Sequence, residues 1–222
     1  MEIIEKALSA GRTILTEHES KLILAEYGIP VTREIIVESR DKLESAVREV
    51  GFPVVLKAAG DIAHKTEAGL VQVDIRDMPE LEAAYDRMTK GSGNGTPLMV
   101  QEMVKGRREL MAGMVRDPQF GPCVMFGLGG IFSEVLRDVS FRVAPVTDLD
   151  AEEMMSEIRA RKILGEVRGM PPADRNELTR ILMAVGKIGL DHKAVKEIDI
   201  NPLILKDGHP VAADALIVLN AD

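Results

Sequence analysis

Apolar residues recur at helical spacing in three segments of the amino-terminal part of this chain. The first segment begins with a capping box at Thr16–Glu19 and ends at Gly28, which is followed closely by a proline. The second covers residues 39–51, and the third begins at Asp77. These patterns predict three amphipathic helices.

Strand patterns lie between these helices. Residues 53–58 form a nearly unbroken apolar run, which is typical of a strand buried on both faces, whereas residues 71–75 alternate. A further strand is expected at residues 31–37. Helices and strands therefore follow one another, as in α/β and α+β proteins.

The glycine-rich segment 91–97 offers little to pack and is the best candidate for a boundary between lobes. We therefore predict an α+β or α/β chain with lobes at residues 1–97 and 98–222 and a ligand cleft between them. The second lobe should contain an antiparallel sheet and two helices. The strands are expected at residues 98–104, 109–115, 123–128 and 135–143, and the helices at 150–162 and 173–188.

Near the end of the chain, two apolar runs flank Asp207-Gly208, the dipeptide of a tight hairpin turn. Asp199 and Asn201 have the same parity on the first strand, and Asp214 is expected on the returning strand. Carboxylate and amide oxygens of this kind suit Mg²⁺ held partly by nucleotide phosphates. A solvent-facing hairpin whose polar residues only make turns and caps is the alternative.

Composition narrows the possible functions. A formal net charge of −8 and an aromatic content of 3% without Trp argue against a nucleic-acid binder. No apolar run approaches the length of a membrane span, and the first residues lack the order of a signal peptide. We expect a cytoplasmic protein that meets anionic substrates with local cations and backbone amides.

Several residues are candidates for phosphate chemistry. Lys57 interrupts an apolar strand, where a phosphate would be a suitable partner, although a lysine that snorkels at a strand end is the alternative. The loop 60–69 surrounds His64 with backbone amides, but a lone loop histidine is usually only solvated. Arg142 is placed either to clamp a phosphoryl group or to make a surface ion pair.

Taken together, the motifs resemble the ATP-grasp superfamily, and within it the nucleotide-binding β chain of ADP-forming acyl-CoA synthetases. The resemblance extends over nearly the whole chain and includes the looser Asn-Pro-Leu to Asp pattern of succinyl-CoA synthetase β chains. The matching segments are residues 54–57, 62–69, 116–122, 126–130, 138–142 and 197–203.

The resemblance implies an ATP-grasp fold that binds ATP or ADP with Mg²⁺. It implies that Lys57 binds the nucleotide phosphates. It also implies that residues near a predicted hinge bind the nucleoside: Glu102 and Val104 bind the adenosine, and Glu109 binds the ribose. Gly69 belongs to the loop that approaches the phosphates. Leu70 departs from the family pattern, in which a second glycine is more common there.

The resemblance also implies that Asn201 and Asp214 hold Mg²⁺ with help from Asp199, and that His64 relays a phosphoryl group. The implied reaction converts acyl-CoA, ADP and phosphate to carboxylate, CoA and ATP through acyl phosphate and phosphohistidine. A CoA-binding α subunit would complete a hetero-oligomer, because no GxGxxG unit is present. The alternatives are another ATP-grasp carboxylate ligase and a nucleotide sensor without catalysis.

Overall fold

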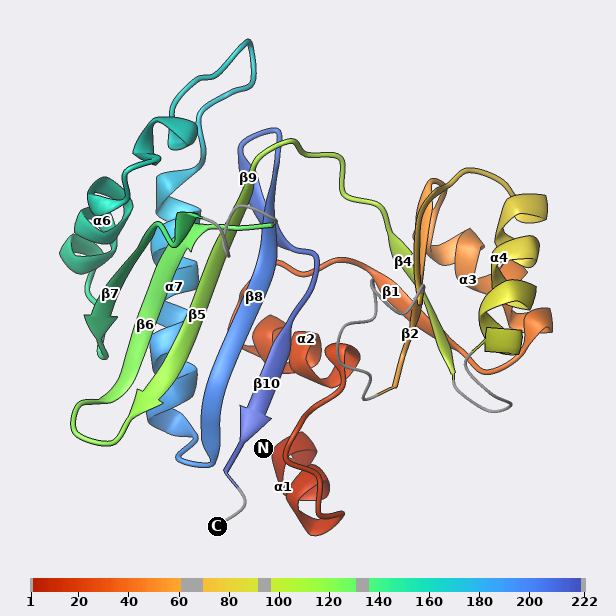
Figure 1. The fold of residues 1–222 in the computed structure, drawn as a ribbon, viewed down its shortest axis with the longest axis horizontal. Coiled ribbons are helices and arrows are strands. Elements are labelled where there is room, and N and C mark those ends of the chain that lie inside the picture. The colour runs from red at the N-terminus through yellow and green to blue at the C-terminus, as the bar shows by residue number, and fades with distance from the viewer. Residues whose placement is uncertain (1, 61–69, 92–96, 131–135, 221–222) are drawn as a thin grey trace. The chain divides into compact units, whose positions relative to one another are not determined.

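The structure is a computed structural model, and it describes residues 2–60, 70–91, 97–130 and 136–220. The chain divides into two compact units (Figure 1). One unit is Thr32–Met103, and the other combines Met1–Val31 with Val104–Asp222. Each unit is built around an antiparallel sheet with its own hydrophobic core.

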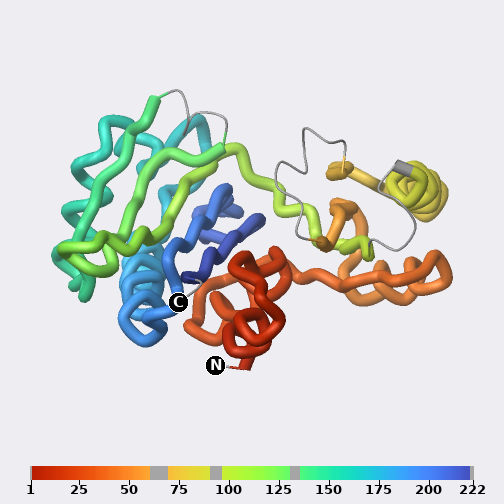
Figure 2. Tube along the Cα trace, turned by 60° about the horizontal axis from the view of Figure 1, so that its bottom comes forward, coloured from red at the N-terminus to blue at the C-terminus, as the bar shows by residue number. Residues whose placement is uncertain are grey.

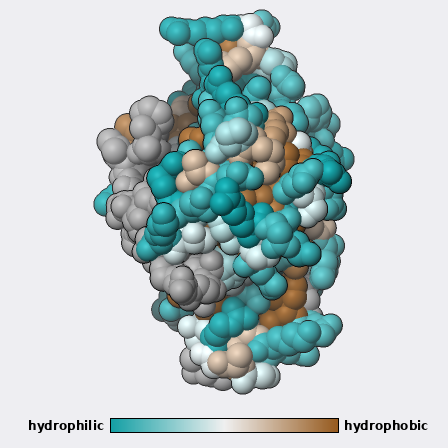
Figure 3. All heavy atoms as spheres, turned by 90° about the vertical axis from the view of Figure 1, so that its right-hand side faces the viewer, coloured by the Kyte–Doolittle hydropathy of each residue, from teal (hydrophilic) through white to brown (hydrophobic). Residues whose placement is uncertain are grey.

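The unit Thr32–Met103 contains a four-stranded sheet in the order β1-β4-β2-β3. Two helices, α3 (Leu43–Val50) and α4 (Met78–Gly91), lie on one face of this sheet (Figure 1; Figure 2). In the view of Figure 3, hydrophilic residues predominate on the visible surface, with smaller hydrophobic areas between them. The strands are β1 (Glu34–Val37), β2 (Val54–Ala58), β3 (Val71–Ile75) and β4 (Leu98–Glu102).

The second unit contains a six-stranded sheet in the order β10-β8-β5-β6-β7, with β9 paired to β8. The helices α6 (Asp148–Glu157) and α7 (Arg175–Asp191) cover one face of this sheet (Figure 1). The strands are β5 (Glu109–Asp117), β6 (Gly121–Leu128), β7 (Val139–Val143), β8 (Val195–Lys206), β9 (His209–Ala212) and β10 (Leu216–Leu219).

The amino-terminal helices α1 (Glu2–Ser9) and α2 (Glu17–Glu26) belong to this second unit. The predicted capping box is confirmed, because the Thr16 side chain accepts the N–H of Glu19 while the Glu19 carboxylate accepts the N–H of Thr16. Among the described residues, no helix is long and apolar enough to cross a membrane.

The α+β fold is confirmed, but the observed division differs from the expected boundary after residue 97. The strand β4 pairs with β1 and β2, so the glycine-rich segment joins two parts of one unit. Residues 1–31 pack with the other unit, where Ile23 and Leu24 of α2 share a core with β5. Both differences arise from long-range pairing that local composition does not encode.

Candidate functional site

Polar side chains line one face of β8, and buried apolar side chains line the other. Ile198 and Ile200 are fully buried, whereas Glu197, Asp199 and Asn201 alternate with them and are only half-buried. The predicted common face of Asp199 and Asn201 is therefore present. Glu197 was not among the predicted ligands, although its parity along the strand groups it with Asp199.

Asp199 carries a buried oxygen that lacks a partner. Within the described part of the chain, Oδ1 of Asp199 is buried without a hydrogen bond. Burial raises the pKa of Asp199 to about 6, with further contributions from the negative charges of Glu197 and Asp214. A carboxylate that has a buried oxygen without a donor and has acidic neighbours is stabilised by a cation, so this site is chemically suited to a divalent metal ion.

Asn201 lies at a bulge in β8. Leu110 of β5 pairs with Leu203 and Ala112 with Ile200, so Asn201 and Pro202 together face only Met111. Bulges of this kind re-aim side chains beside functional sites. The amide oxygen Oδ1 of Asn201 accepts the backbone N–H of Gly130 at 2.9 Å. This oxygen keeps a second lone pair that can serve a metal ion.

The backbone of Gly129 and Gly130 approaches β5 closely. The N–H of Gly129 donates to the carbonyl oxygen of Glu109 at 2.9 Å, and a Cβ atom at Gly129 would collide with the backbone of Leu110. Gly130 has a φ of 63°, and a Cβ atom there would overlap the carboxylate of Glu109. This packing brings Gly130, Glu109 and Asn201 together at one end of the sheet.

The hairpin turn forms at Asp207-Gly208 as predicted, with φ values of 51° and 91°. Asp214, however, lies in the connection between β9 and β10 and not on the returning strand, which ends at Ala212. The connection still brings the Asp214 charge within reach of Asp199, whose strand partner is Leu216 of β10. The three predicted metal residues are thus placed in one region of β8 and its neighbours.

The candidate nucleotide residues occupy both units. Lys57 is buried in β2, with 7% of its surface exposed. Both carboxylate oxygens of Glu102 in β4 are engaged by Arg33, whose N–H donates to Oε1 at 2.9 Å and whose Nη2 donates to Oε2 at 3.1 Å. Val104 is half-buried at the start of the other unit. His64 and Gly69 lie outside the described residues.

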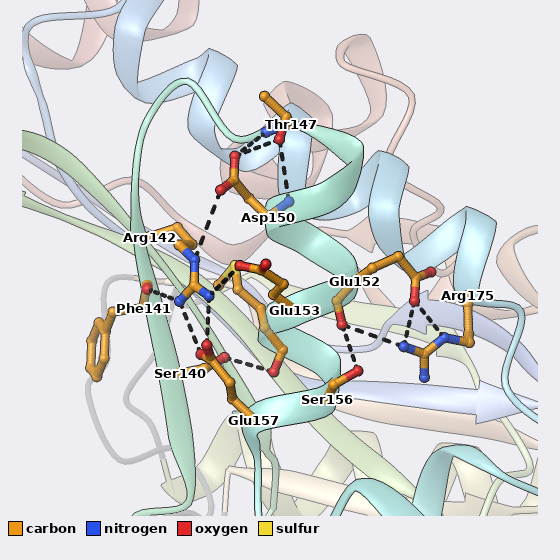
Figure 4. Close-up of polar contacts among 11 residues, drawn as sticks. Ser140, Phe141, Arg142, Thr147, Asp150, Glu152, Glu153, Ser156, Glu157 and Arg175 are labelled. Atoms are coloured by element: carbon orange, nitrogen blue, oxygen red, sulfur yellow. Dashed lines mark hydrogen bonds and ion pairs between the residues drawn. The ribbon is translucent and has the colours of Figure 1, made fainter.

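Arg142 makes the surface ion pairs that the sequence left open as an alternative (Figure 4). Its guanidinium contacts both carboxylate oxygens of Glu157 at 2.6 and 2.9 Å and one of Glu153 at 3.0 Å. The hydrogen bond to Glu157, and to a smaller extent the one to Glu153, raises the pKa of Arg142 above its usual value. This geometry favours a role in fastening β7 to α6 over a role as a phosphoryl clamp.

The raised pKa of Asp199 predicts a pH dependence of stability in the metal-free protein. The folded pKa of about 6 exceeds the ordinary value of 3.8, so this contribution is fully present below pH 3.8 and is lost as the pH rises through about 6. The shift corresponds to about 2–3 kcal/mol. We therefore expect Asp199→Asn to raise the free energy of unfolding at about pH 7.5 but not at about pH 4.

Urea titrations of the metal-free wild type and Asp199→Asn at both pH values measure this effect. Asp191→Asn is a matched control, because the pKa of Asp191, at the end of α7, is shifted in the opposite direction. The hydrogen bond from Lys187 is the largest cause of this lowered pKa. Identical pH profiles for the wild type and Asp199→Asn would contradict the raised pKa of Asp199.

The chain contains two antiparallel sheets, each covered by helices, and one of them includes a hairpin with carboxylate and amide oxygens. This arrangement places the chain in the class of α+β proteins, to which ATP-grasp domains also belong. The family model for the ATP-grasp domain matches residues 6–219, and the chain belongs to this family. The predicted membership of the ATP-grasp superfamily and the resemblance to ADP-forming acyl-CoA synthetase β chains are therefore confirmed.

The most informative relatives are ADP-forming ligases. The β subunit of acetate–CoA ligase [ADP-forming] I from Pyrococcus furiosus is 42% identical, over 98% of this chain and 97% of its own length. Acetate–CoA ligase [ADP-forming] I from Archaeoglobus fulgidus is 40% identical, but this chain spans only 33% of it. The same sequence region thus occurs both as a separate subunit and within a larger protein.

Solved structures show the same relationship. The dinucleotide-forming acetyl-coenzyme A synthetase 1 of Ca. Korarchaeum cryptofilum, in complex with coenzyme A and Ca-AMPCP, superimposes with a TM-score of 0.94 at 40% identity, covering 99% of both chains. A second structure of that enzyme, in complex with coenzyme A and Mg-AMPPCP and with its phosphohistidine segment pointing towards the nucleotide binding site, gives a TM-score of 0.89 at 41% identity and covers 99% of both chains.

Proposed function

We propose that this chain is the nucleotide-binding subunit of an ADP-forming acyl-CoA synthetase. It would take part in the reversible conversion of acyl-CoA, ADP and phosphate to carboxylate, CoA and ATP. The observation that carries this proposal is the match to a separate β subunit of an ADP-forming ligase over almost the full length of both chains. The oxygen-rich region around β8 supports it, because phosphoryl transfer depends mainly on positioning and on neutralisation of charge.

We propose that Asp199, Asn201 and Asp214 hold Mg²⁺ together with the nucleotide phosphates. The buried, unpartnered oxygen of Asp199 fits a cation, and the donor set consists of hard oxygens only. When bound, Mg²⁺ would neutralise the phosphate charge. The chain's own residues would orient that ion, with Asn201 fixed by the N–H of Gly130.

We assign nucleotide binding to the residues that the sequence motifs single out. Lys57 would contact its phosphates, aided by the loop that contains Gly69, and Glu109 would contact the ribose. Because Arg33 already engages both carboxylate oxygens of Glu102, we assign recognition of adenine to main-chain groups at Glu102 and Val104. Specific recognition of this kind needs no aromatic platform, which agrees with the low aromatic content.

The remaining chemistry is assigned to His64 and to a partner. His64 would accept and release the phosphoryl group, because the neutral form of imidazole is nucleophilic near neutral pH. A CoA-binding α subunit would supply the acyl-CoA site. Relatives that contain this region within a larger protein support the idea that both functions belong to one assembly.

Reconstitution tests the proposal. The chain would be purified alone and after coexpression with a CoA-binding candidate subunit, and ATP formation from acetyl-CoA, ADP and phosphate would be measured. We expect copurification and turnover only in the complex, because the acyl-CoA site is assigned to the partner. Turnover by the isolated chain with a different acceptor would instead indicate a self-sufficient carboxylate ligase, and nucleotide binding without turnover in any complex would indicate a sensor.

A further inference from the structure

A second group of ligand-type side chains lies where α7 begins, away from the acidic face of β8. Asp174 is the N-cap residue of α7, Glu177 lies in its first turn, and His209 begins β9. One donor atom from each of these three residues lies within 4.8 Å of the others. Neither the family motifs nor the proposed reaction uses these residues.

Hydrogen bonds from backbone N–H groups tie Asp174 to the β8–β9 turn, next to His209, and to Glu177. The N–H of Asp174 donates to the carbonyl oxygen of Gly208 at 2.9 Å, which holds the β8–β9 turn against the start of α7. Oδ1 of Asp174 accepts the N–H of Glu177 at 3.0 Å, and this leaves Oδ2 directed toward the imidazole. The arrangement is therefore built by the fold before any ion binds.

We propose that Asp174, Glu177 and His209 form a binding site for a divalent transition-metal ion of the zinc type. Nδ1 of His209 lies 3.0 Å from Oε2 of Glu177 and 3.9 Å from Oδ2 of Asp174. Ligand bonds of about 2.0–2.2 Å in a tetrahedral site place donor atoms about 3.4 Å apart, and the two observed distances bracket that value.

The donor set also selects the type of ion. One imidazole and two carboxylates suit zinc, whereas Mg²⁺ prefers the oxygen-only set at Asp199, Asn201 and Asp214. The two carboxylates balance the charge of the ion. The positive end of the α7 dipole modestly disfavours binding of a cation there. The side chain of His209 is 60% exposed, so the ion can enter from solvent and keep water in its fourth position.

Bound metal would replace the contact between His209 and Glu177 and would fasten the β8–β9 turn to α7. Because β8 also carries Asp199 and Asn201, the ion would stabilise the hairpin that presents the proposed Mg²⁺ site. The effect is a gain in stability that depends on the Zn²⁺ concentration.

Calorimetric titration of the full chain with Zn²⁺, in excess Mg²⁺, tests this site. We expect one Zn²⁺ to bind, with an affinity that falls at least about tenfold in His209→Ala and in Glu177→Gln. His18→Ala is the matched histidine control and should bind as the wild type does. Thermal melting without Zn²⁺ checks that each variant is folded.

Asp214→Asn separates the two metal sites. Undiminished Zn²⁺ binding in this variant supports the site at α7, whereas loss of binding would place the ion on the β8 face and overturn the proposal. The proposal is also overturned if the wild type binds no Zn²⁺, or if folded His209→Ala and Glu177→Gln bind it as tightly as the wild type.

Discussion

Replacing His64 with alanine should abolish ATP formation from acyl-CoA, ADP and phosphate in the assembled enzyme while leaving ADP affinity nearly unchanged. The nucleophile that carries the phosphoryl group would be lost, whereas the groups assigned to nucleotide binding would remain. We expect turnover to fall at least about a thousandfold. Coupled ATP assays and equilibrium binding of ADP measure the two quantities separately.

Labelling with radioactive phosphate makes this test specific. The wild-type chain should become labelled in the presence of its partner, the label should be acid-labile, and His64→Ala should remain unlabelled. His18→Ala is the matched control, because it removes a histidine from α2 and should retain both label and turnover. Full activity in His64→Ala would show that this histidine is only a loop residue.

Replacing Asp214 with asparagine should strongly weaken Mg²⁺-dependent nucleotide binding while preserving the fold. The change keeps the shape of the side chain but removes one of the charges proposed to hold the ion next to Asp199. We expect the affinity for ADP in the presence of Mg²⁺ to fall by about 10–100-fold, with a smaller change when Mg²⁺ is absent. Calorimetry at a series of Mg²⁺ concentrations measures both effects.

Asp207→Asn provides the matched control in the same hairpin. Asp207 occupies the turn at a φ of 51°, a conformation that asparagine also tolerates, so nucleotide binding should be unchanged. If Asp214→Asn retained the full Mg²⁺ dependence of the wild type, the assignment of Asp214 to the metal site would be refuted.

The sequence by itself determined most local elements and the chemistry of the hairpin. Capping at Thr16, the turn at Asp207-Gly208 and the alternation around Asp199 are encoded within a few residues, and each forms as predicted. The motif pattern also identified the family, because several matching segments occur in the right order along the chain.

Tertiary structure decided which distant segments meet. It placed β4 with β1 and β2, and it attached residues 1–31 to the larger unit, because strand pairing and core packing join positions far apart in the sequence. It also moved Asp214 off the strand that local pattern suggested, since β9 ends at Ala212.

The same limit applies to individual side chains. Arg142 has the same sequence context whether it binds phosphate or pairs with acids, and only the docking of α6 beside β7 brings Glu153 and Glu157 to its guanidinium. The local sequence also does not predict that Oδ1 of Asp199 is buried without a hydrogen-bond donor. The sequence therefore determined the types of groups and their local order, and the tertiary structure decided their partners, because partners come from elements far away in the chain.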